Sequence, residues 1–324
     1  MYLELINLLA AILIPFLSLI LFKIKKILIY VNNEQSTIKK SQGIIFGGIY
    51  FVSVIILNIF YFKIFDLNIM PFFLLIFLIG YFDDRLSLSP IIRIVSFVAM
   101  FSLIIFFEND FLLKNLLFTD NYNLHLGKYG FVFTILCFLL FINACNMADG
   151  INGLLTSLYI IWFFLLFINS LYFQNYFFLS IILSLIIFLF LNIKKEVYLG
   201  DSGNYLITSV LALLTIKTYN YNSEFLRADI IFSWFALPGI DMLRLFFQRI
   251  INKKSPFKPD FNHLHHYLIQ RFNLFNSLII YLLICVSFFI LFAYSNLFFI
   301  FNFTICFFIY FLLLVLLKNV KKKI

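Results

Sequence analysis

Long apolar runs alternate with short polar segments along the whole chain. Most of these runs approach the roughly 20 residues that a helix needs to cross a bilayer. The pattern therefore predicts an all-α fold, a polytopic membrane bundle of about 11 transmembrane helices. In chain order the predicted spans cover residues 3–22, 44–62, 69–82, 90–107, 131–144, 154–173, 177–193, 205–216, 230–247, 277–294 and 297–317.

The composition agrees with a membrane protein, since 64% of the residues are hydrophobic and 12% are charged. No internal repeat and no long polar linker divides the chain, so we expect a single integral-membrane domain over residues 1–324. The four cysteines lie in apolar runs without CxxC spacing, which argues against a disulfide framework and against a zinc site.

Charged residues around the first apolar run predict its orientation. Glu4 precedes the run and Lys23, Lys25 and Lys26 follow it, which is the reverse of a cleavable signal peptide. We therefore expect the N-terminus outside and, with an odd number of spans, a cytoplasmic C-terminus. This orientation and anionic lipid explain the net charge of +9, so we expect no nucleic-acid partner.

A run of small and polar residues follows the fifth predicted span. Asn143, Asn146, Asp149 and Asn152 recur at every third position, so on a helix they would form one slowly drifting ridge. Polar groups at membrane depth normally face a bundle interior or a wet cavity. The alternative is a polar seam in which these amides bond across two helices.

Two adjacent carboxylates, Asp83 and Asp84, end the third predicted span. Because adjacent carboxylates repel each other, a bound cation would favour keeping both ionised. The alternative is ordinary loop acidity, with Arg85 as a partner.

A third acidic position, Asp201, lies in the Gly-Asp-Ser-Gly segment 200–203 that opens the eighth predicted span. The flanking glycines allow a tight backbone turn that would expose this carboxylate. A helix N-cap is the competing explanation, and it does not exclude metal ligation.

The ninth predicted span carries Asp241, Arg244 and Gln248 at spacings of three and four, which put them on one helix face. An internal ion pair is the simplest interpretation. The span ends close to Arg249.

Three of the four histidines, His263, His265 and His266, cluster in the following loop. His263 and His265 share a side if the segment is extended, whereas His263 and His266 do if it is helical. Histidines near Lys and Arg suit an anionic phosphate ligand. Zinc is the alternative, but neither cysteines nor HExxH spacing support it.

Taken together, these polar segments predict a membrane enzyme that handles phosphates at the cytoplasmic interface. They supply carboxylates for a divalent cation, cations for phosphates and amides for a base or sugar. A polytopic transporter of a phosphorylated or anionic solute is the alternative, since it also carries intramembrane charge. A transporter would place these groups near the bilayer midplane, often within repeats.

The four ordered motifs resemble the polyprenyl-phosphate N-acetylhexosamine-1-phosphate transferase superfamily, glycosyltransferase family 4. The resemblance covers roughly residues 43–268 and rests on Asp83-Asp84, 143–154, 200–203 and the 263–266 histidines that follow Ser255-Pro256. The histidine pattern is more similar to the undecaprenyl-phosphate GlcNAc-1-phosphate transferase branch than to phospho-N-acetylmuramoyl-pentapeptide transferase.

The resemblance implies an enzyme of the bacterial inner membrane that initiates a cell-surface glycan. Its partners would be a UDP-sugar, polyprenyl phosphate and membrane lipid, with Mg²⁺ as cofactor and Mn²⁺ as a substitute; a homodimer is allowed. The lipid phosphate would attack the β-phosphate of the UDP-sugar and release UMP. The sugar stays open among GlcNAc, a deoxy-amino sugar such as di-N-acetylbacillosamine or FucNAc, and muramoyl-pentapeptide.

The resemblance also implies a role for each motif. Asp83 and Asp84 would act on the lipid phosphate as catalytic residues, and Asp201, with Asp149, would hold the metal. The implied substrate-binding residues are Asn143, Asn146, Asn152, Tyr198, Arg249, His263, His265 and His266. Among them Tyr198 would stack on uracil, while the histidines and Arg249 would clamp phosphate or sugar.

The chain departs from the family pattern in two places. Asn152 stands where the family often has Asp, so base recognition is expected to differ. Residues 39–43, ahead of Gly47-Gly48, also match the family's usual proline-containing loop poorly.

Overall fold

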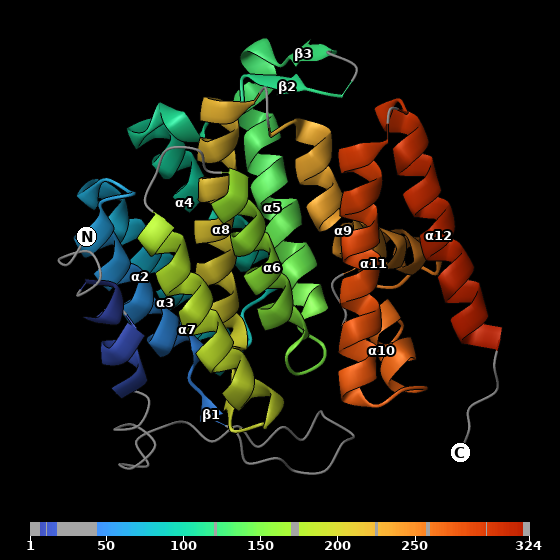
Figure 1. Ribbon diagram of the computed structural model, residues 1–324, viewed down its shortest axis with the longest axis horizontal. Helices are drawn as coiled ribbons and strands as arrows, with labels where there is room; N and C mark the ends of the chain where they lie inside the picture. Colours follow the sequence, from blue (N-terminus) through green and yellow to red (C-terminus); the bar gives the residue numbers. More distant parts are fainter. Residues whose placement is uncertain are drawn as a thin grey trace. The chain divides into compact units, whose positions relative to one another are not determined.

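The computed structural model describes residues 7–10, 12–17, 44–119, 122–169, 175–223, 226–256, 260–295 and 297–319. Almost all of the regular structure in these ranges is helical (Figure 1). By its contacts the chain divides into a first unit, Met1–Phe111 with Leu155–Leu214, and a second unit, Leu112–Leu154 with Thr215–Ile324. This division does not test the prediction of a single integral-membrane domain, which stays a prediction.

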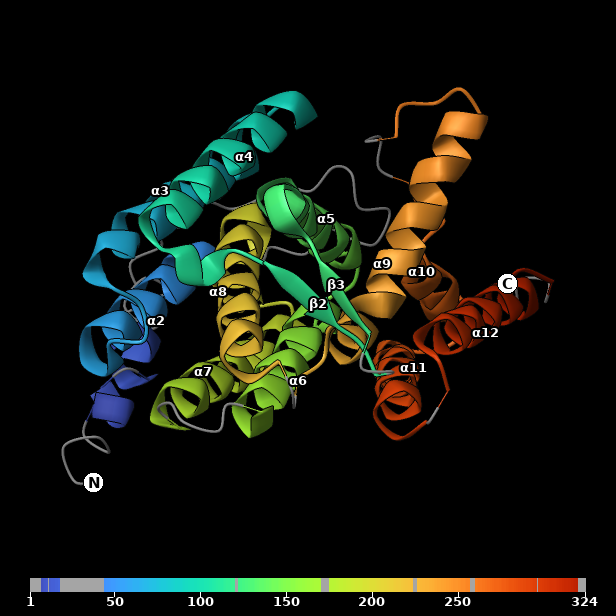
Figure 2. The same cartoon turned by 90° about the horizontal axis from the view of Figure 1, so that it is seen from above.

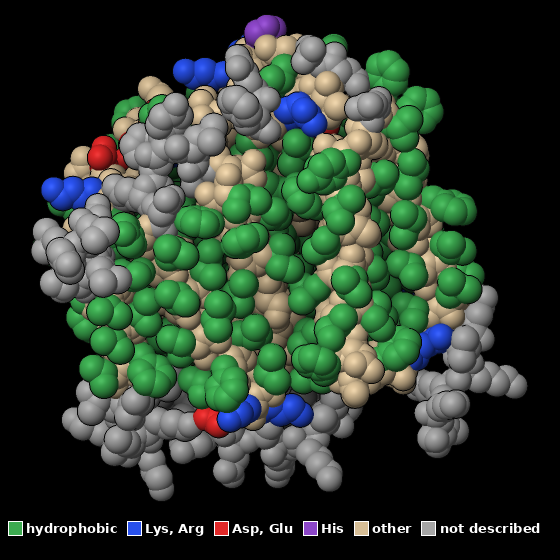
Figure 3. Space-filling view, viewed as in Figure 1, with side chains coloured by type: hydrophobic (Ala, Val, Ile, Leu, Met, Phe, Trp, Pro, Cys, Tyr) green, Lys and Arg blue, Asp and Glu red, His purple; other side chains and the backbone are tan. Residues whose placement is uncertain are grey.

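Within the described residues, seven helices are long and apolar enough to cross a membrane. They cover Leu67–Leu86, Pro90–Phe107, Gly127–Ala148, Tyr176–Ile193, Ala228–Ile251, Leu274–Tyr294 and Phe299–Lys318. Hydrophobic side chains cover most of the face seen in Figure 3, as expected for helices in lipid. The all-α, polytopic membrane fold is therefore confirmed, whereas the number of spans and the positions of the termini stay predictions.

The first unit consists mainly of helices and also contains one short two-stranded sheet. The helices are α2 (Gly47–Phe62), η1 (Leu67–Ile69), α3 (Met70–Leu86), α4 (Pro90–Phe107), η2 (Asn109–Phe111), α6 (Leu154–Asn169), α7 (Asn175–Ile193) and the first part of α8 (Gly200–Asn222). Strand β1 (Ile44–Ile45) pairs in parallel with β4 (Val197–Tyr198), just before α8. The core contains buried aromatic rings, such as Tyr50 stacked on Phe188.

Local sequence explains where the helices around the first unit's acidic residues begin and end. Helix α4 starts at Pro90, which needs no N–H partner, and its N-cap Ser89 accepts from the Ile92 N–H. Helix α3 ends at Leu86, and its C-cap Ser87 takes the left-handed conformation. Asp83 and Asp84 thus lie in the last turn of α3.

Close packing of α3 on α8 positions the start of α8. A Cβ on Gly80 would lie 2.4 Å from the Ser202 Cα, so only glycine lets the two backbones approach this closely. Gly200 opens α8 with a φ of +70°, which is the left-handed region that favours glycine. Asp201 therefore lies inside the first turn of α8.

The second unit contains a hairpin and the remaining helices. Strands β2 (Asn115–Leu117) and β3 (Asn123–His125) pair antiparallel. The helices are η3 (Gly127–Tyr129), α5 (Gly130–Ala148), the end of α8, α9 (Ala228–Ile251), α10 (Leu264–Ile269), α11 (Leu274–Tyr294) and α12 (Phe299–Asn319). Helix α9 packs against both α5 and α11 (Figure 2).

Each predicted span from 44–62 onward coincides with an observed helix, although several bounds differ. The largest difference is in α8, predicted over 205–216 and observed over Gly200–Asn222. Helix α10 and both short sheets were not predicted. The first predicted span, 3–22, lies only partly within the described residues, and residues 39–43 lie outside them.

Candidate functional site

In the first unit, the carboxylate of Asp84 is bound to the first turn of α8. Its Oδ1 accepts from the Asp201 N–H at 2.7 Å, and its Oδ2 accepts from the Ser202 N–H at 3.1 Å and the Ser202 Oγ at 2.7 Å. A helix N-terminus leaves such N–H groups without intrahelical partners. Asp84 supplies the acceptor from α3 and thereby fixes the backbone that carries Asp201.

The neighbouring Asp83 is buried and has three donors. Its Oδ1 accepts from the Leu88 N–H at 2.8 Å, and its Oδ2 accepts from the Tyr205 hydroxyl at 2.7 Å and from Arg93 Nη1 at 3.2 Å. The Arg93 guanidinium also donates to the Tyr205 hydroxyl at 3.1 Å. The basic partner of Asp83 is thus Arg93, while Arg85 lies over the Tyr81 ring.

Asp201 and Tyr198 lie close together in sequence at the junction of β4 and α8. Asp201 is half-buried, and its charge acts on both Arg93 and Tyr205. Tyr198 is half-buried at the end of β4, where its carbonyl accepts from the Phe46 N–H at 3.2 Å. The first unit therefore gathers Asp83, Asp84, Asp201 and Arg93 around one helix start.

In the second unit, the Asn- and Asp-containing run spans the end of α5 and the following turn. Asn143 and Asn146 lie on the helix, and the Asn143 amide donates to the Leu139 carbonyl at 2.7 Å. The helix ends at Ala148, so Asp149 is its exposed C-cap and Asn152 is half-buried in the turn. The predicted helical ridge thus holds for its first two members only.

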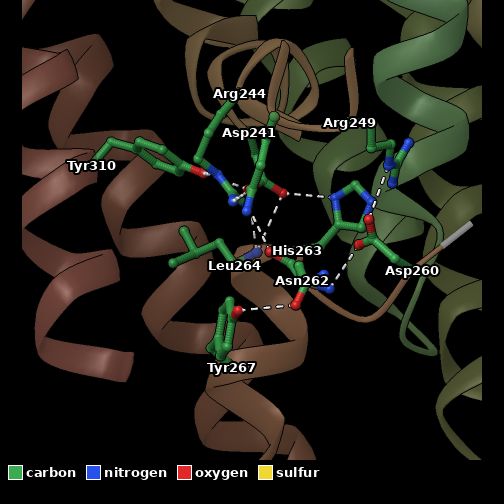
Figure 4. Close-up of polar contacts among 10 residues, drawn as sticks. Asp241, Arg244, Arg249, Asp260, Asn262, His263, Leu264, Tyr267 and Tyr310 are labelled. Carbon is green, nitrogen blue, oxygen red and sulfur yellow. Dashed lines mark hydrogen bonds and ion pairs between the residues drawn. The ribbon is translucent and has the colours of Figure 1, made fainter. Parts of the chain in front are cut away.

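The histidine loop, residues 260–266, is anchored by α9 (Figure 4). Asp241 Oδ2 lies 2.9 Å from His263 Nδ1, and both Asp241 oxygens lie 3.3 Å from the Leu264 N–H. Arg244 donates to Asp241 at 3.0 Å and to the Asn262 carbonyl at 2.5 Å. The predicted ion pair on α9 is confirmed, and it holds the loop as well.

The segment 263–266 is extended at its first residue and helical afterwards. His263 has φ −70° and ψ 150° and precedes α10, while His265 and His266 lie within that helix. The rings of His263 and His265 are 5.2 Å apart and nearly parallel, at 11°. His265 and His266 have ring centroids 4.3 Å apart, so all three imidazoles form one group.

Arg249 is buried and reaches the same loop. It donates to Asp260 at 2.9 Å and to the Pro256 carbonyl at 2.6 Å. Burial alone would raise the pKa of Asp260, but the hydrogen bonds from Arg249 and from the Asn262 N–H outweigh it and lower that pKa. Among the described residues, Arg249 Nη2 has no hydrogen-bond partner.

His265 is also buried, and neither of its ring nitrogens has a hydrogen-bond partner among the residues described. A Cβ on Gly150 would lie 2.0 Å from His265 Nε2, so the glycine brings the turn after α5 against the histidine loop. Burial lowers the pKa of His265 well below its ordinary value, and the His266 and His263 charges lower it further. Burial likewise lowers the pKa of His266 to about 4, with His263 adding to the effect.

One group of three potential metal ligands occurs in the part of the chain that the structure describes. Ligand atoms of Asp241, His263 and His265 lie within 4.8 Å of one another. The Asp241 oxygens are already occupied by hydrogen bonds, and nitrogen ligands do not suit Mg²⁺. This group therefore does not fit the expected magnesium.

Oxygen ligands suited to Mg²⁺ are present elsewhere. Asp201 is half-buried and Asp149 is exposed, and they belong to different units. A few carboxylates together with substrate phosphates are the environment that Mg²⁺ prefers. The chemistry of these two side chains fits the ion.

Sequence reasoning missed several contributing residues. Arg93 and Tyr205 bind Asp83, and Tyr310 in α12 donates to Asp241 at 2.5 Å. Tyr205 follows Asp201 by four residues on α8, a spacing that could have indicated it. No local pattern indicates Tyr310, because it lies 69 residues from Asp241.

Comparison with known proteins gives one family match. Residues 67–219 match the model of glycosyl transferase family 4. This range contains Asp83, Asp84, Asp201 and the 143–154 run, and it ends before the histidine loop.

The chain is also similar to curated proteins that share one name, undecaprenyl-phosphate alpha-N-acetylglucosaminyl 1-phosphate transferase. The protein from Escherichia coli O157:H7 is 28% identical over 201 residues, which cover 59% of this chain and 55% of that protein. The Salmonella typhi protein is 26% identical over 275 residues, covering 79% and 74%. The Thermotoga maritima protein is 26% identical over 222 residues, covering 65% of each. In the first of these matches, the chain spans about half the length of its relative.

Proposed function

We propose that this chain is a member of glycosyl transferase family 4 and that it transfers a sugar-1-phosphate from a UDP-sugar to undecaprenyl (polyprenyl) phosphate. The sugar is proposed to be an N-acetylhexosamine, because the relatives are named for N-acetylglucosaminyl 1-phosphate transfer. The transporter alternative is not favoured by the family match. Seven apolar helices and bacterial relatives support a multi-pass protein of the bacterial inner membrane.

In the proposed reaction, an oxygen of the lipid phosphate forms a bond to the β-phosphorus of the UDP-sugar. The bond from that phosphorus to the oxygen bridging it to the α-phosphate breaks. The bridging oxygen keeps the electron pair, so UMP leaves and one sugar phosphate stays on the lipid. Several negative charges come together in this step, and the protein must offset them.

The observation that carries the proposal is the arrangement of acidic groups around the start of α8. Asp84 accepts hydrogen bonds from the backbone N–H groups of Asp201 and Ser202 and from the Ser202 hydroxyl, which fixes the backbone that carries Asp201. We assign Asp201 to Mg²⁺, for which Mn²⁺ could substitute, and the implied role of Asp149 as a metal ligand stays a prediction. When bound, the ion supplies positive charge to the diphosphate.

Asp83 and Arg93 are assigned to the lipid phosphate. Asp83 orients Arg93 through a 3.2 Å ion pair and is itself held by Tyr205. A guanidinium suits recognition of a phosphate, and Asp83 can position or deprotonate the incoming oxyacid.

The second unit is assigned to the donor substrate. Buried donors without partners are costly, so Arg249 Nη2 and the His265 ring favour an anionic group of the ligand. We assign these two residues, with His263 and His266, to phosphate or sugar. The amides of Asn143, Asn146 and Asn152 are assigned to the nucleotide, and Tyr198 of the first unit to stacking on uracil.

A nucleotide-release assay tests the reaction. Purified protein is incubated with polyprenyl phosphate, Mg²⁺ and a panel of UDP-sugars, and the lipid product is identified by mass spectrometry. We expect UMP formation that requires both the lipid and Mg²⁺ and reverses with excess UMP. Release of UDP, or of UMP without the lipid, would contradict the proposal.

Cysteine labelling tests the proposed cytoplasmic location of these motifs. In a cysteine-free background, Lys195→Cys lies at an exposed turn before α8, and Lys128→Cys lies at an exposed site before α5. We expect an impermeant reagent to label Lys128→Cys in intact cells and Lys195→Cys only after permeabilisation. The reverse result would refute the orientation.

A further inference from the structure

A hydroxyl of the last helix lies at the centre of the contacts that hold the histidine loop. The buried Tyr310 hydroxyl of α12 donates to Asp241 Oδ1 at 2.5 Å and accepts from Arg244 Nε at 2.5 Å. Asp241 and Arg244 in turn contact Asn262, His263 and Leu264, which are consecutive in the loop (Figure 4). Removing this hydroxyl would leave both α9 side chains with one partner fewer.

The contact between Asp241 and His263 defines one tautomer of the imidazole. Asp241 also accepts from Tyr310, Arg244 and the Leu264 N–H, which favours the ionised carboxylate. An ionised carboxylate can only accept hydrogen bonds, so His263 Nδ1 must carry the proton. The Nε2 atom of His263 is then the nitrogen that remains to interact with a ligand.

Helix α12 makes a second contact with the same loop. Lys318 Nζ lies 5.7 Å from the centre of the Tyr267 ring, and the Tyr267 hydroxyl donates to Asn262 at 3.2 Å. Helices α10 and α12 are in contact, so α12 packs against the helix that contains the end of the histidine loop. This helix lies beyond residues 67–219, the range of the family match.

We propose that Tyr310 is a positioning residue: it fixes the Asp241 carboxylate, which keeps His263 in the Nδ1-protonated tautomer and leaves its Nε2 to interact with the donor substrate. The inference rests on the proposed function for its kinetic test, whereas the tautomer can be measured without any reaction. Tyr310 itself makes no contact with substrate in this assignment.

The kinetic test compares two Tyr→Phe variants of the second unit. Tyr310→Phe should lower kcat about 10-fold, the effect of one buried hydrogen bond to a charged group, with little change in KM for the UDP-sugar. The matched control is Tyr219→Phe, which also removes a buried hydroxyl, one bonded to Leu117 and Asn115 of the hairpin. That hairpin contacts α9 at Asp229, about 18 Å along the helix from Asp241. Equal rates for the two variants would overturn the proposal.

A double-mutant cycle separates positioning from general destabilisation. If Tyr310 acts through His263, then Tyr310→Phe should cause no further loss of rate in a His263→Gln background. If the two losses multiply instead, Tyr310 acts independently and the proposal is wrong.

Nitrogen NMR tests the tautomer directly on protein labelled with ¹⁵N-histidine. In the neutral ring, the His263 signals should show a protonated Nδ1 and an unprotonated Nε2. They are assigned by their disappearance in His263→Gln. Asp241→Asn, whose amide can donate as well as accept, should produce a mixture of tautomers, and an unchanged spectrum would overturn the inference. Because this readout needs no substrate, its result stands even if the transferase assay fails.

Discussion

In the first unit the carboxylates of Asp83 and Asp84 each accept three hydrogen bonds from their own unit. In the second unit, by contrast, the buried His265 ring and Arg249 Nη2 lack hydrogen-bond partners among the described residues. Asp83 and Asp84 are thus fixed before any ligand arrives, whereas among the described residues of the second unit His265 and Arg249 keep polar nitrogens available.

This difference indicates which groups are structural and which await a ligand. A buried polar group without a partner costs about 1–3 kcal/mol, so the second unit gains stability when an anion supplies the missing acceptors. A carboxylate whose oxygens already accept three hydrogen bonds gains no comparable stability from a ligand. Its role is to fix the groups that it contacts. Asp84 fixes the start of α8, and Asp83 fixes Arg93.

The largest effect is expected from Asp201→Asn, which tests whether the first unit holds a cation at all. Losing the carboxylate should lower the rate about 10³-fold, because several kcal/mol of charge stabilisation at the diphosphate disappear. UMP release at saturating Mg²⁺ measures this loss. Asp66→Asn, at an exposed aspartate of the same unit, is the control and should leave the rate unchanged. Near-normal turnover in Asp201→Asn would show that the charge of this side chain is not needed at the diphosphate.

The next prediction separates the two saturated carboxylates. Asp83→Asn and Asp84→Asn should each lower the rate about 10²-fold. They should differ in metal dependence: Asp84→Asn loosens the backbone of Asp201 and should raise the Mg²⁺ concentration for half-maximal rate about 10-fold. Asp83→Asn should leave that concentration unchanged. Identical Mg²⁺ titrations for the two variants would show that Asp84 does not act through α8.

The hydrophobic pattern predicted the bounds of a helix well where local residues clearly mark its first or last turn. The span 90–107 coincides with α4, because Ser89 and Pro90 mark its start. The start of α8 was predicted too late, since Asp201, Ser202 and Asn204 are polar and weaken the apolar window. In the structure Ser202 and Asn204 are nevertheless buried, through contacts that local sequence does not reveal.

Residue types predicted the acidic and histidine positions, but not their partners. The pairs Arg93–Asp83 and Tyr310–Asp241 join different helices, so helical periodicity carries no signal for them. The sequence left open whether the histidine segment is extended or helical. Each alternative holds for part of it, because His263 is extended and the helix begins at Leu264. The assignments of these residues to substrates stay proposals.

A smaller effect is expected from Gly150→Ala, which tests the packing of the turn after α5 on the histidine loop. The new Cβ would lie 2.0 Å from His265 Nε2, so the ring or the turn must move, at a cost of about 1–3 kcal/mol. Gly239→Ala is the matched control in the same unit, because its Cβ would meet nothing within 4 Å and alanine favours a helix. Thermal unfolding in detergent should show a lower Tm for Gly150→Ala only. Equal Tm values would mean that this contact is not maintained in solution.

The smallest expected effect is a loss of stability on mild acidification. It follows from the lowered pKa values of His265 and His266. His266 has a pKa of about 4 in the folded chain, against about 6.5 in an unfolded one. The unfolded state therefore binds more protons between these values, so this stabilisation is full above pH 6.5 and is lost as the pH falls toward 4. His265, with its pKa also lowered, acts in the same direction. After allowance for solvent screening of His266, its share is about 1–2 kcal/mol. The Tm should fall from pH 7.5 to pH 5, and the fall should be smaller in His266→Gln than in the unmodified protein. An unchanged slope in His266→Gln would show that the histidine loop is more open to water than its burial here indicates.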